Sequence, residues 1–138
     1  MTVKLTVVYW DASAVLSVCF YREQSEVAMD RAREPGIHLI SSLAWAESHA
    51  VIARLERENA IASIFAEAAR ESLDRGPWRR VHLTPDWRDA ADLARRWPLR
   101  GADLWHLALA SRLRIDLPEL ELLTFYTRLA TAARAEGL

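Results

Sequence analysis

Near its start the chain reads Leu5-Thr-Val-Val-Tyr-Trp-Asp11-Ala-Ser13, an apolar run that ends in a single acid. β-Branched and aromatic residues dominate the stretch from Lys4 to Trp10, which predicts a strand. Almost none of these residues is polar, so both faces of the strand should be buried, as in the middle of a parallel sheet. Ligands bind such sheets beyond the carboxyl ends of the strands. Asp11 therefore stands where a functional side chain is expected.

A helix is expected to begin just after this strand. Ser13 can cap an apolar helix from Ala14 to Phe20, because a serine hydroxyl accepts a hydrogen bond from the first helical turn. Asp11 then occupies the junction between strand and helix. An aspartate at such a junction has a second interpretation, since its carboxylate often bonds the nearby backbone and only shapes the turn.

The composition of the chain is that of one folded domain. Its 138 residues form a single predicted domain over 1–138, are 51% hydrophobic and 27% charged, and carry a formal net charge of -1. These values suit a globular protein with one core and exclude a disordered chain. The large positive charge of a stable DNA-binding protein is missing. A nuclease that holds its substrate through metal ions and a few arginines is compatible with this charge.

Two further features bear on the cellular compartment. The single cysteine, Cys19, has no partner for an internal disulfide and lies in the apolar helix, where it fits as a core residue. No apolar run reaches the roughly 18 residues of a membrane span, and the N-terminus leads directly into a strand. We therefore expect a cytoplasmic protein with no membrane partner.

Strands and helices alternate along the rest of the chain. Short strands are predicted over residues 37–40, 80–83 and 120–125, and helices over residues 23–33, 43–58, 60–73, 84–97, 102–114 and 127–135. Ser41 or Ser42 is expected to cap the helix over 43–58. The apolar side of the helix over 60–73 is predicted from Ile61, Ile64, Phe65 and Ala68. This order predicts an α/β fold, a compact three-layer α/β/α domain with a short central parallel sheet.

Glu47 lies on the apolar stripe of the helix predicted over 43–58. At about 100° per residue, three apolar residues fall within about 60° of it on the helix surface. These residues are Leu43, Ala50 and Val51. A buried carboxylate without a partner is costly, so Glu47 needs a hydrogen bond, a cation or a metal ion. Arg54, two turns further along the helix, is one candidate partner, and a metal ion is the other.

Asp103 opens the helix predicted over 102–114. An acid in the first turn of a helix is stabilised by the helix dipole, which is a sufficient structural reason for its presence. His106, three residues further on, is a candidate partner on the same helix. A functional interpretation needs other acids nearby.

Asp11, Glu47 and Asp103 can meet if their elements converge on one edge of the sheet. Three carboxylates in one place repel each other unless a cation neutralises them, and oxygen ligands select a hard ion such as Mg²⁺ or Mn²⁺. The chemistry then expected is phosphodiester hydrolysis, because such an ion binds phosphates and lowers the pKa of an attacking water. Ser13 has two interpretations here, as a helix cap and as a residue that holds a metal-bound water.

Four motifs, in this order along the chain, carry a resemblance to a known family. They are Val-Val-Tyr-Trp-Asp11-Ala-Ser13, Ser42-Leu-Ala-Trp-Ala-Glu47, Arg100-Gly-Ala-Asp103-Leu-Trp-His106-Leu-Ala-Leu-Ala and Leu123-Thr-Phe-Tyr126-Thr-Arg128-Leu. Together they span nearly the whole chain and resemble the PIN-domain nucleases, in particular the VapC-type toxins of bacterial toxin-antitoxin pairs. The resemblance implies that Asp11, Glu47 and Asp103 are the catalytic acids, that they bind Mg²⁺ or Mn²⁺, and that the enzyme cleaves RNA. It also implies a homodimer and a cognate antitoxin that covers the acidic groove.

The sequence departs from the family pattern at one position. The last motif in the family usually carries a fourth acid after Thr-Phe, where this chain has Tyr126. We expect Ser13, Thr124 and Tyr126 to be supporting residues of the site. A phenol is neutral at pH 7 and a poor Mg²⁺ ligand, so a second metal position is in question. Glu121 is predicted on the opposite strand face and too far away to substitute. Two functions stay open: a ribonuclease of weakened metal affinity, and an inactive PIN-like protein that binds RNA or titrates an antitoxin.

Overall fold

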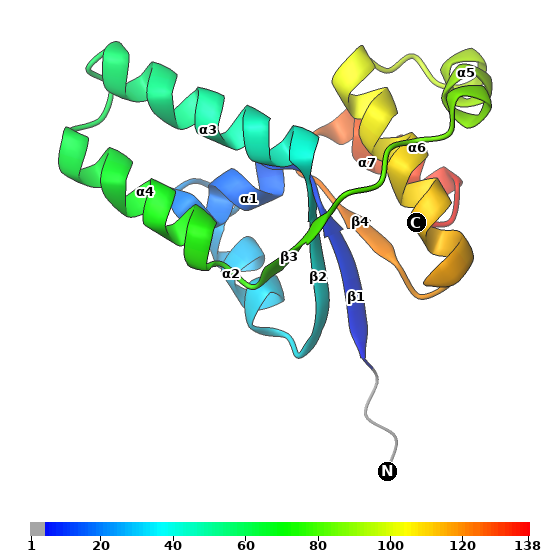
Figure 1. Ribbon diagram of the computed structural model, residues 1–138, viewed down its shortest axis with the longest axis horizontal. Coiled ribbons are helices and arrows are strands. Elements are labelled where there is room, and N and C mark those ends of the chain that lie inside the picture. The colour runs from blue at the N-terminus through cyan, green and yellow to red at the C-terminus, as the bar shows by residue number, and fades with distance from the viewer. Residues whose placement is uncertain (1–4) are drawn as a thin grey trace.

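The computed structural model describes residues 5–138, in which strands and helices alternate (Figure 1). The elements in chain order are β1 (Thr6–Trp10), α1 (Ala12–Cys19), α2 (Ser25–Arg33), β2 (Gly36–Ser41), α3 (Ser42–Arg57), α4 (Ser63–Arg75), β3 (Trp78–Val81), α5 (Trp87–Arg96), α6 (Gly101–Asp116), β4 (Glu121–Leu123) and α7 (Thr127–Ala135). Within residues 5–138, every helix is too short or too polar to cross a membrane. The predicted α/β class is confirmed.

All four strands are parallel and form one sheet in the order β3-β2-β1-β4. β1 lies inside the sheet, where Tyr9 pairs with Leu39 of β2 on one side and with Leu122 of β4 on the other. The last four residues of β1 are buried, which explains why this strand is apolar on both faces. Its predicted position inside a parallel sheet is therefore confirmed.

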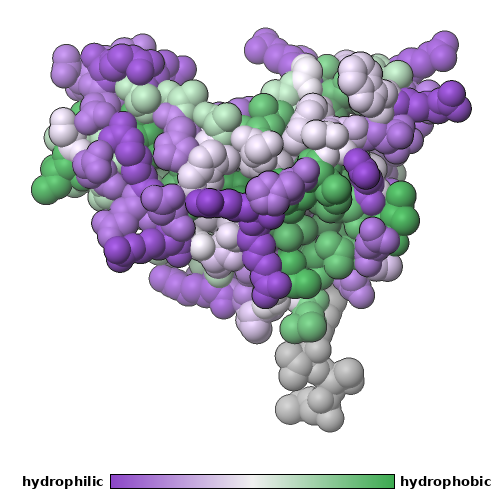
Figure 2. Space-filling view, viewed as in Figure 1, coloured by the Kyte–Doolittle hydropathy of each residue, from purple (hydrophilic) through white to green (hydrophobic). Residues whose placement is uncertain are grey.

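Helices cover both faces of the sheet, so the domain has three layers (Figure 1). Successive strand residues point to opposite faces. Val8 and Trp10 of β1 belong to a core shared with α1–α4, whereas Val7 and Tyr9 belong to a second core shared with α5–α7. Figure 2 shows apolar side chains at the surface between β3 and α6. Helices thus cover the sheet incompletely at this place.

Two strands begin or end at different residues from those predicted. β3 begins two residues before the predicted range 80–83, because the ring of Trp78 packs edge-on against Trp10, with ring centroids 5.6 Å apart. β4 is shorter than the predicted range 120–125 and ends before Thr124. The Thr124 hydroxyl instead donates a hydrogen bond to the loop that follows β1. This exit from the sheet brings the end of β4 to Asp11.

The starts of α4 and α5 each lie three residues after the predicted ones. α5 begins at Trp87 rather than at 84, because Asp86 caps it by accepting hydrogen bonds from the N–H groups of Arg88 and Asp89. α4 begins three residues after the predicted start at 60. The predicted first strand began at Lys4, which lies outside the described residues.

The apolar side predicted for α4 is wrong. Ile64 and Phe65 are 75% and 64% exposed, whereas Ala66, Ala69 and Leu73 are buried. α4 packs against α1 and α3, and alanine side chains let these helices approach closely. Hydrophobicity ranks isoleucine and phenylalanine above alanine, but the space between the helices accepts only the small residues.

Candidate active site

The side on which successive strands are added to the sheet changes at β1. From β1 the chain builds β2 and β3 on one side, and it returns much later to place β4 on the other side of β1. In open α/β sheets, ligands bind at the carboxyl ends of the strands beside such a switch point. Asp11 follows β1 and Thr124 follows β4, and the Asp11 N–H donates to the Leu123 carbonyl at 3.2 Å. Asp11 therefore lies at the position where a site is expected.

The Asp11 carboxylate is buried and has three hydrogen-bond donors. Its Oδ1 accepts from the Ala14 N–H at 3.0 Å and from the Ser13 hydroxyl at 2.7 Å, and its Oδ2 accepts from the Thr124 hydroxyl. Only 1% of the residue is exposed. Burial raises the pKa of Asp11, and the hydrogen bonds from Ser13, Thr124 and Ala14 act against this rise. These donors hold the carboxylate in one orientation beneath the surface.

Asp11, and not Ser13, caps α1. The helix begins at Ala12, one residue before the predicted cap, and the Asp11 side chain accepts the N–H of Ala14. A carboxylate suits this position because it also interacts favourably with the helix dipole. The Ser13 hydroxyl is free for another contact and accepts the Phe125 N–H at 2.9 Å. Ser13 thus links the loop after β1 to the loop after β4.

Glu47 reaches the same edge of the sheet from the second turn of α3. Ser41 caps this helix by accepting the Ala44 N–H at 3.1 Å, as one of the two predicted serines should. The carboxylate bonds His106 of α6, with 2.8 Å between Oε1 and Nε2. Its partner is therefore neither Arg54, which is exposed, nor a residue of its own helix. Because 31% of the Glu47 side chain is exposed, part of it faces solvent.

Asp103 lies in the first turn of α6 and is partly buried. Burial is the main cause that raises its pKa, and the charge of Glu47 raises it further, while His106 and Arg100 lower it. The predicted pairing with His106 is not formed, because the His106 ring bonds Glu47 and Tyr9 instead. Within residues 5–138, the salt bridges do not include Asp103.

Tyr126 lies where the three acids come together. It is 49% exposed and precedes α7 as a cap residue without a capping side-chain bond. Burial raises the pKa of its hydroxyl, and the charges of Asp11, Glu47 and Asp103 each raise it further. Three acids from three elements therefore lie within electrostatic reach of one phenol.

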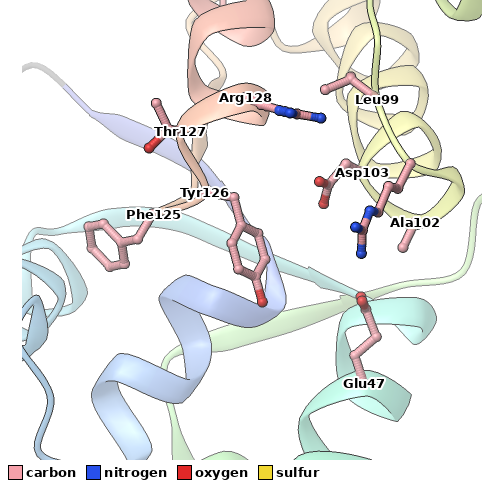
Figure 3. A pocket seen from close by; sticks show the side chains of 9 residues that line it. Glu47, Leu99, Ala102, Asp103, Phe125, Tyr126, Thr127 and Arg128 are labelled. Carbon is pink, nitrogen blue, oxygen red and sulfur yellow. The ribbon is translucent and has the colours of Figure 1, made fainter.

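An open groove of about 680 Å³ is lined by Glu47, Asp103 and Tyr126, whereas the buried Asp11 is not part of its lining. In Figure 3 the carboxylates of Glu47 and Asp103 turn toward the space that Tyr126 and Arg128 also border. The remaining lining residues are Leu99, Arg100, Ala102, Phe125 and Thr127. Arg100 and Arg128 are exposed, and the salt bridges within residues 5–138 include neither of them. The groove thus presents carboxylates and free guanidinium groups side by side.

The donor chemistry of the site fits a hard divalent cation. Its ligands would be carboxylate oxygens from Asp11, Glu47 and Asp103, which Mg²⁺ and Mn²⁺ prefer. Burial is the main cause of the raised pKa of Asp103, and the negative charge of Glu47 adds to it. Among the residues that the structure describes, no three His, Cys, Asp or Glu side chains lie close enough together to hold a metal ion as they stand. Glu47 and Asp103 line the same groove, and Asp11 lies beneath the surface at the end of β1.

Two residues considered from the sequence lie outside the groove. Glu121 forms a salt bridge with Arg31 at 2.7 Å, so it does not replace the missing fourth acid. Cys19 is half-buried, and burial raises the pKa of its thiol to about 12. A protonated thiol is a poor nucleophile, in agreement with a packing role.

Sequence reasoning missed the hydrogen bonds that hold Glu47. The Glu47 partner His106 and its neighbour Tyr9 are 59 and 38 residues away in sequence, and only their placement in space joins them. The sequence did contain one indication that His106 belongs to the site, because His106 lies one helical turn after Asp103 on the same helix.

No protein-family model matches the chain, and no curated protein matches it either. The resemblance to PIN-domain nucleases is therefore carried by the four motifs alone, and it stays a prediction.

Proposed function

We propose that this protein is a metal-dependent endoribonuclease of the PIN-domain type, the toxin of a toxin-antitoxin pair. The observation that carries the proposal is that Glu47 and Asp103 line one groove with Tyr126, at the edge of the sheet where Asp11 follows β1. These three residues are the acids of the motifs that resemble the VapC-type toxins. Like charges are gathered at a cost in stability, which favours a functional reason for their proximity.

Asp11, Glu47 and Asp103 would hold Mg²⁺ or Mn²⁺. Such an ion supplies a water of lowered pKa and neutralises charge on the phosphate that is attacked. The chain itself contributes orientation: Ser13 and Thr124 hold the Asp11 carboxylate, and the groove admits a polymer because it is open. Arginine forks bind phosphate oxygens in pairs, so Arg100 and Arg128 are suited to hold the RNA backbone beside the acids.

A second function is favoured by Tyr126. Its raised pKa keeps the hydroxyl protonated at neutral pH, so the phenol is no substitute for the fourth acid. Asp11 is also buried, with hydrogen bonds to both oxygens. A protein that binds RNA or titrates an antitoxin without cutting would have the same groove and weak metal binding.

The partners follow from the same resemblance. We propose RNA as the substrate, a cognate antitoxin protein that covers the groove, and a second copy of this chain in a homodimer. The cytoplasm is the compartment that we propose, because it is where a bacterial toxin of this type meets its RNA.

The test is cleavage of a mixed RNA pool by purified protein, free of any antitoxin, over a range of Mg²⁺ and Mn²⁺ concentrations. Asp103→Asn should abolish metal-dependent cleavage, because this acid faces the groove. Asp89→Asn is the matched control, since Asp89 lies in the first turn of α5 as Asp103 lies in the first turn of α6. The control should cut like the parent.

Tyr126→Asp separates the two candidate functions. An active parent whose Tyr126→Asp variant cuts at lower metal concentration supports a nuclease with weakened metal affinity. If the parent cleaves no RNA but the Tyr126→Asp variant does, the result supports a protein that binds without cutting. If neither protein cleaves RNA at any concentration of either metal, the result contradicts the nuclease proposal.

A further inference from the structure

A row of three side chains connects the core of the sheet to the groove. The Tyr9 hydroxyl lies 2.5 Å from Nδ1 of His106, and Nε2 of His106 lies 2.8 Å from Oε1 of Glu47. The Tyr9 and His106 rings meet edge-on, with centroids 5.6 Å apart. Tyr9 and His106 are 0% and 2% exposed, so only Glu47 at the end of the row touches solvent. Each side chain comes from a different element, β1, α6 and α3.

With a neutral imidazole, the hydrogen-bonding chemistry of the three groups gives one arrangement of the protons in this row. An ionised carboxylate only accepts hydrogen bonds, so Nε2 of His106 carries the hydrogen that bonds Glu47. The neutral imidazole then accepts at Nδ1, and the Tyr9 hydroxyl donates to it. Burial raises the pKa of Tyr9 far above its usual value, so the hydroxyl keeps the proton that it donates. In this arrangement each of the three groups has a hydrogen-bond partner.

We infer that Tyr9 and His106 are positioning residues, which hold one oxygen of Glu47 in place and leave its other oxygen available to a metal ion. This inference rests on the proposed function, because it gives the Glu47 carboxylate its role. A glutamate on a helix surface normally samples several rotamers, and ordering it has an entropic cost. Here the row orders Glu47 before any ion arrives. Partners of this kind behind a metal ligand typically change metal affinity by 10–100-fold when they are removed.

The direction of His106 favours this role over simple satisfaction of a buried histidine. Asp103 precedes His106 by one helical turn and is the nearer acid in sequence, yet the ring bonds Glu47 across the gap between α6 and α3. α6 therefore supplies one acid directly and orients another through His106.

Tyr9→Phe tests the inference, because it removes one hydroxyl and keeps the buried ring. Tyr9→Phe should weaken Mn²⁺ binding to the purified chain about 10-fold. The electron paramagnetic resonance signal of the free ion measures this binding. Single-stranded RNA binding in metal-free buffer should not change. Tyr21→Phe is the matched control, since Tyr21 is 100% exposed, and it should bind Mn²⁺ like the parent.

Variants of His106 provide a rescue. His106→Gln keeps an N–H donor for Glu47 and should retain more Mn²⁺ affinity than His106→Ala, even where both lower the melting temperature. All binding is measured well below the lowest melting temperature of the set. If Tyr9→Phe binds Mn²⁺ as tightly as the parent, or if His106→Gln and His106→Ala lose affinity equally, the positioning role is overturned.

The outcomes also separate this inference from the proposed function. A parent that binds Mn²⁺ but cuts no RNA contradicts the nuclease and leaves the positioning role to be judged by the Tyr9→Phe affinity. A parent that cuts RNA while Tyr9→Phe binds Mn²⁺ normally contradicts the positioning role alone. A parent that binds no Mn²⁺ overturns both.

Discussion

Asp103 illustrates at the scale of one residue how a site of this kind lowers stability. Its carboxylate shares a groove with Glu47, and burial together with the charge of Glu47 raises its pKa. A raised pKa means that the fold favours the protonated acid, so ionised Asp103 destabilises the metal-free protein. Functional sites often carry such a cost.

We predict that Asp103→Asn stabilises the metal-free protein at pH 7 by roughly 0.5 kcal/mol, or about 2 °C in melting temperature. The gain should shrink as the pH falls through the raised pKa of Asp103, because the parent then gains the proton that removes its disadvantage. Thermal melts in chelator at several pH values measure both effects. A variant that is less stable than the parent at pH 7 would show that Asp103 mainly serves its helix, as its place in the first turn of α6 alone would suggest.

Single residues also show where sequence reasoning ends. Asp11 could be predicted at a functional position, because an acid after a buried strand faces the carboxyl edge of the sheet. The exchange of roles between Asp11 and Ser13 could not, since both are good helix caps. The deciding contact comes from Phe125, more than one hundred residues later, whose N–H donates to the Ser13 hydroxyl. Local propensity carries no information about such a partner.

At the scale of elements, α4 tests how the core is built. Leu73 is 1% exposed, whereas Phe65 is 64% exposed on the same helix. We predict that Leu73→Ala lowers the free energy of unfolding by about 2–4 kcal/mol, because it leaves a cavity between packed helices. Phe65→Ala should change it by less than about 0.5 kcal/mol. Urea unfolding of both variants measures the difference, and a larger loss for Phe65→Ala would show that α4 buries its other side.

The elements as a set were largely predictable, and their contacts were not. Alternating strand and helix signals lead to the three-layer fold, because β1 is apolar on both faces and the connections are helical. Glu47 was predicted on an inward stripe of its helix. Its partner was not, because His106 reaches it only where α6 passes α3. The crossing of two helices depends on packing, which a periodic pattern does not describe.

For the whole molecule, the net charge of -1 limits how it can bind RNA. A protein without an overall positive field must hold phosphates through local cations. Arg100 and Arg128 line the groove beside Glu47 and Asp103, and no other groove residue is basic. RNA binding should therefore depend on these two residues far more than on the other arginines of the surface.

We predict that Arg100→Gln and Arg128→Gln each weaken the binding of single-stranded RNA and each reduce the slope of log K against log salt concentration by about 0.7, the value for one phosphate contact on a single strand. Arg95→Gln is the control, because Arg95 is exposed on α5 and does not line the groove. Fluorescence anisotropy of a labelled oligonucleotide in metal-free buffer, at several salt concentrations, gives the slopes. Equal slopes for the parent and both groove variants would contradict RNA binding in this groove. A reduced slope for Arg95→Gln as well would mean that RNA contacts the surface diffusely, because a distant arginine then contributes as much as those beside the acids.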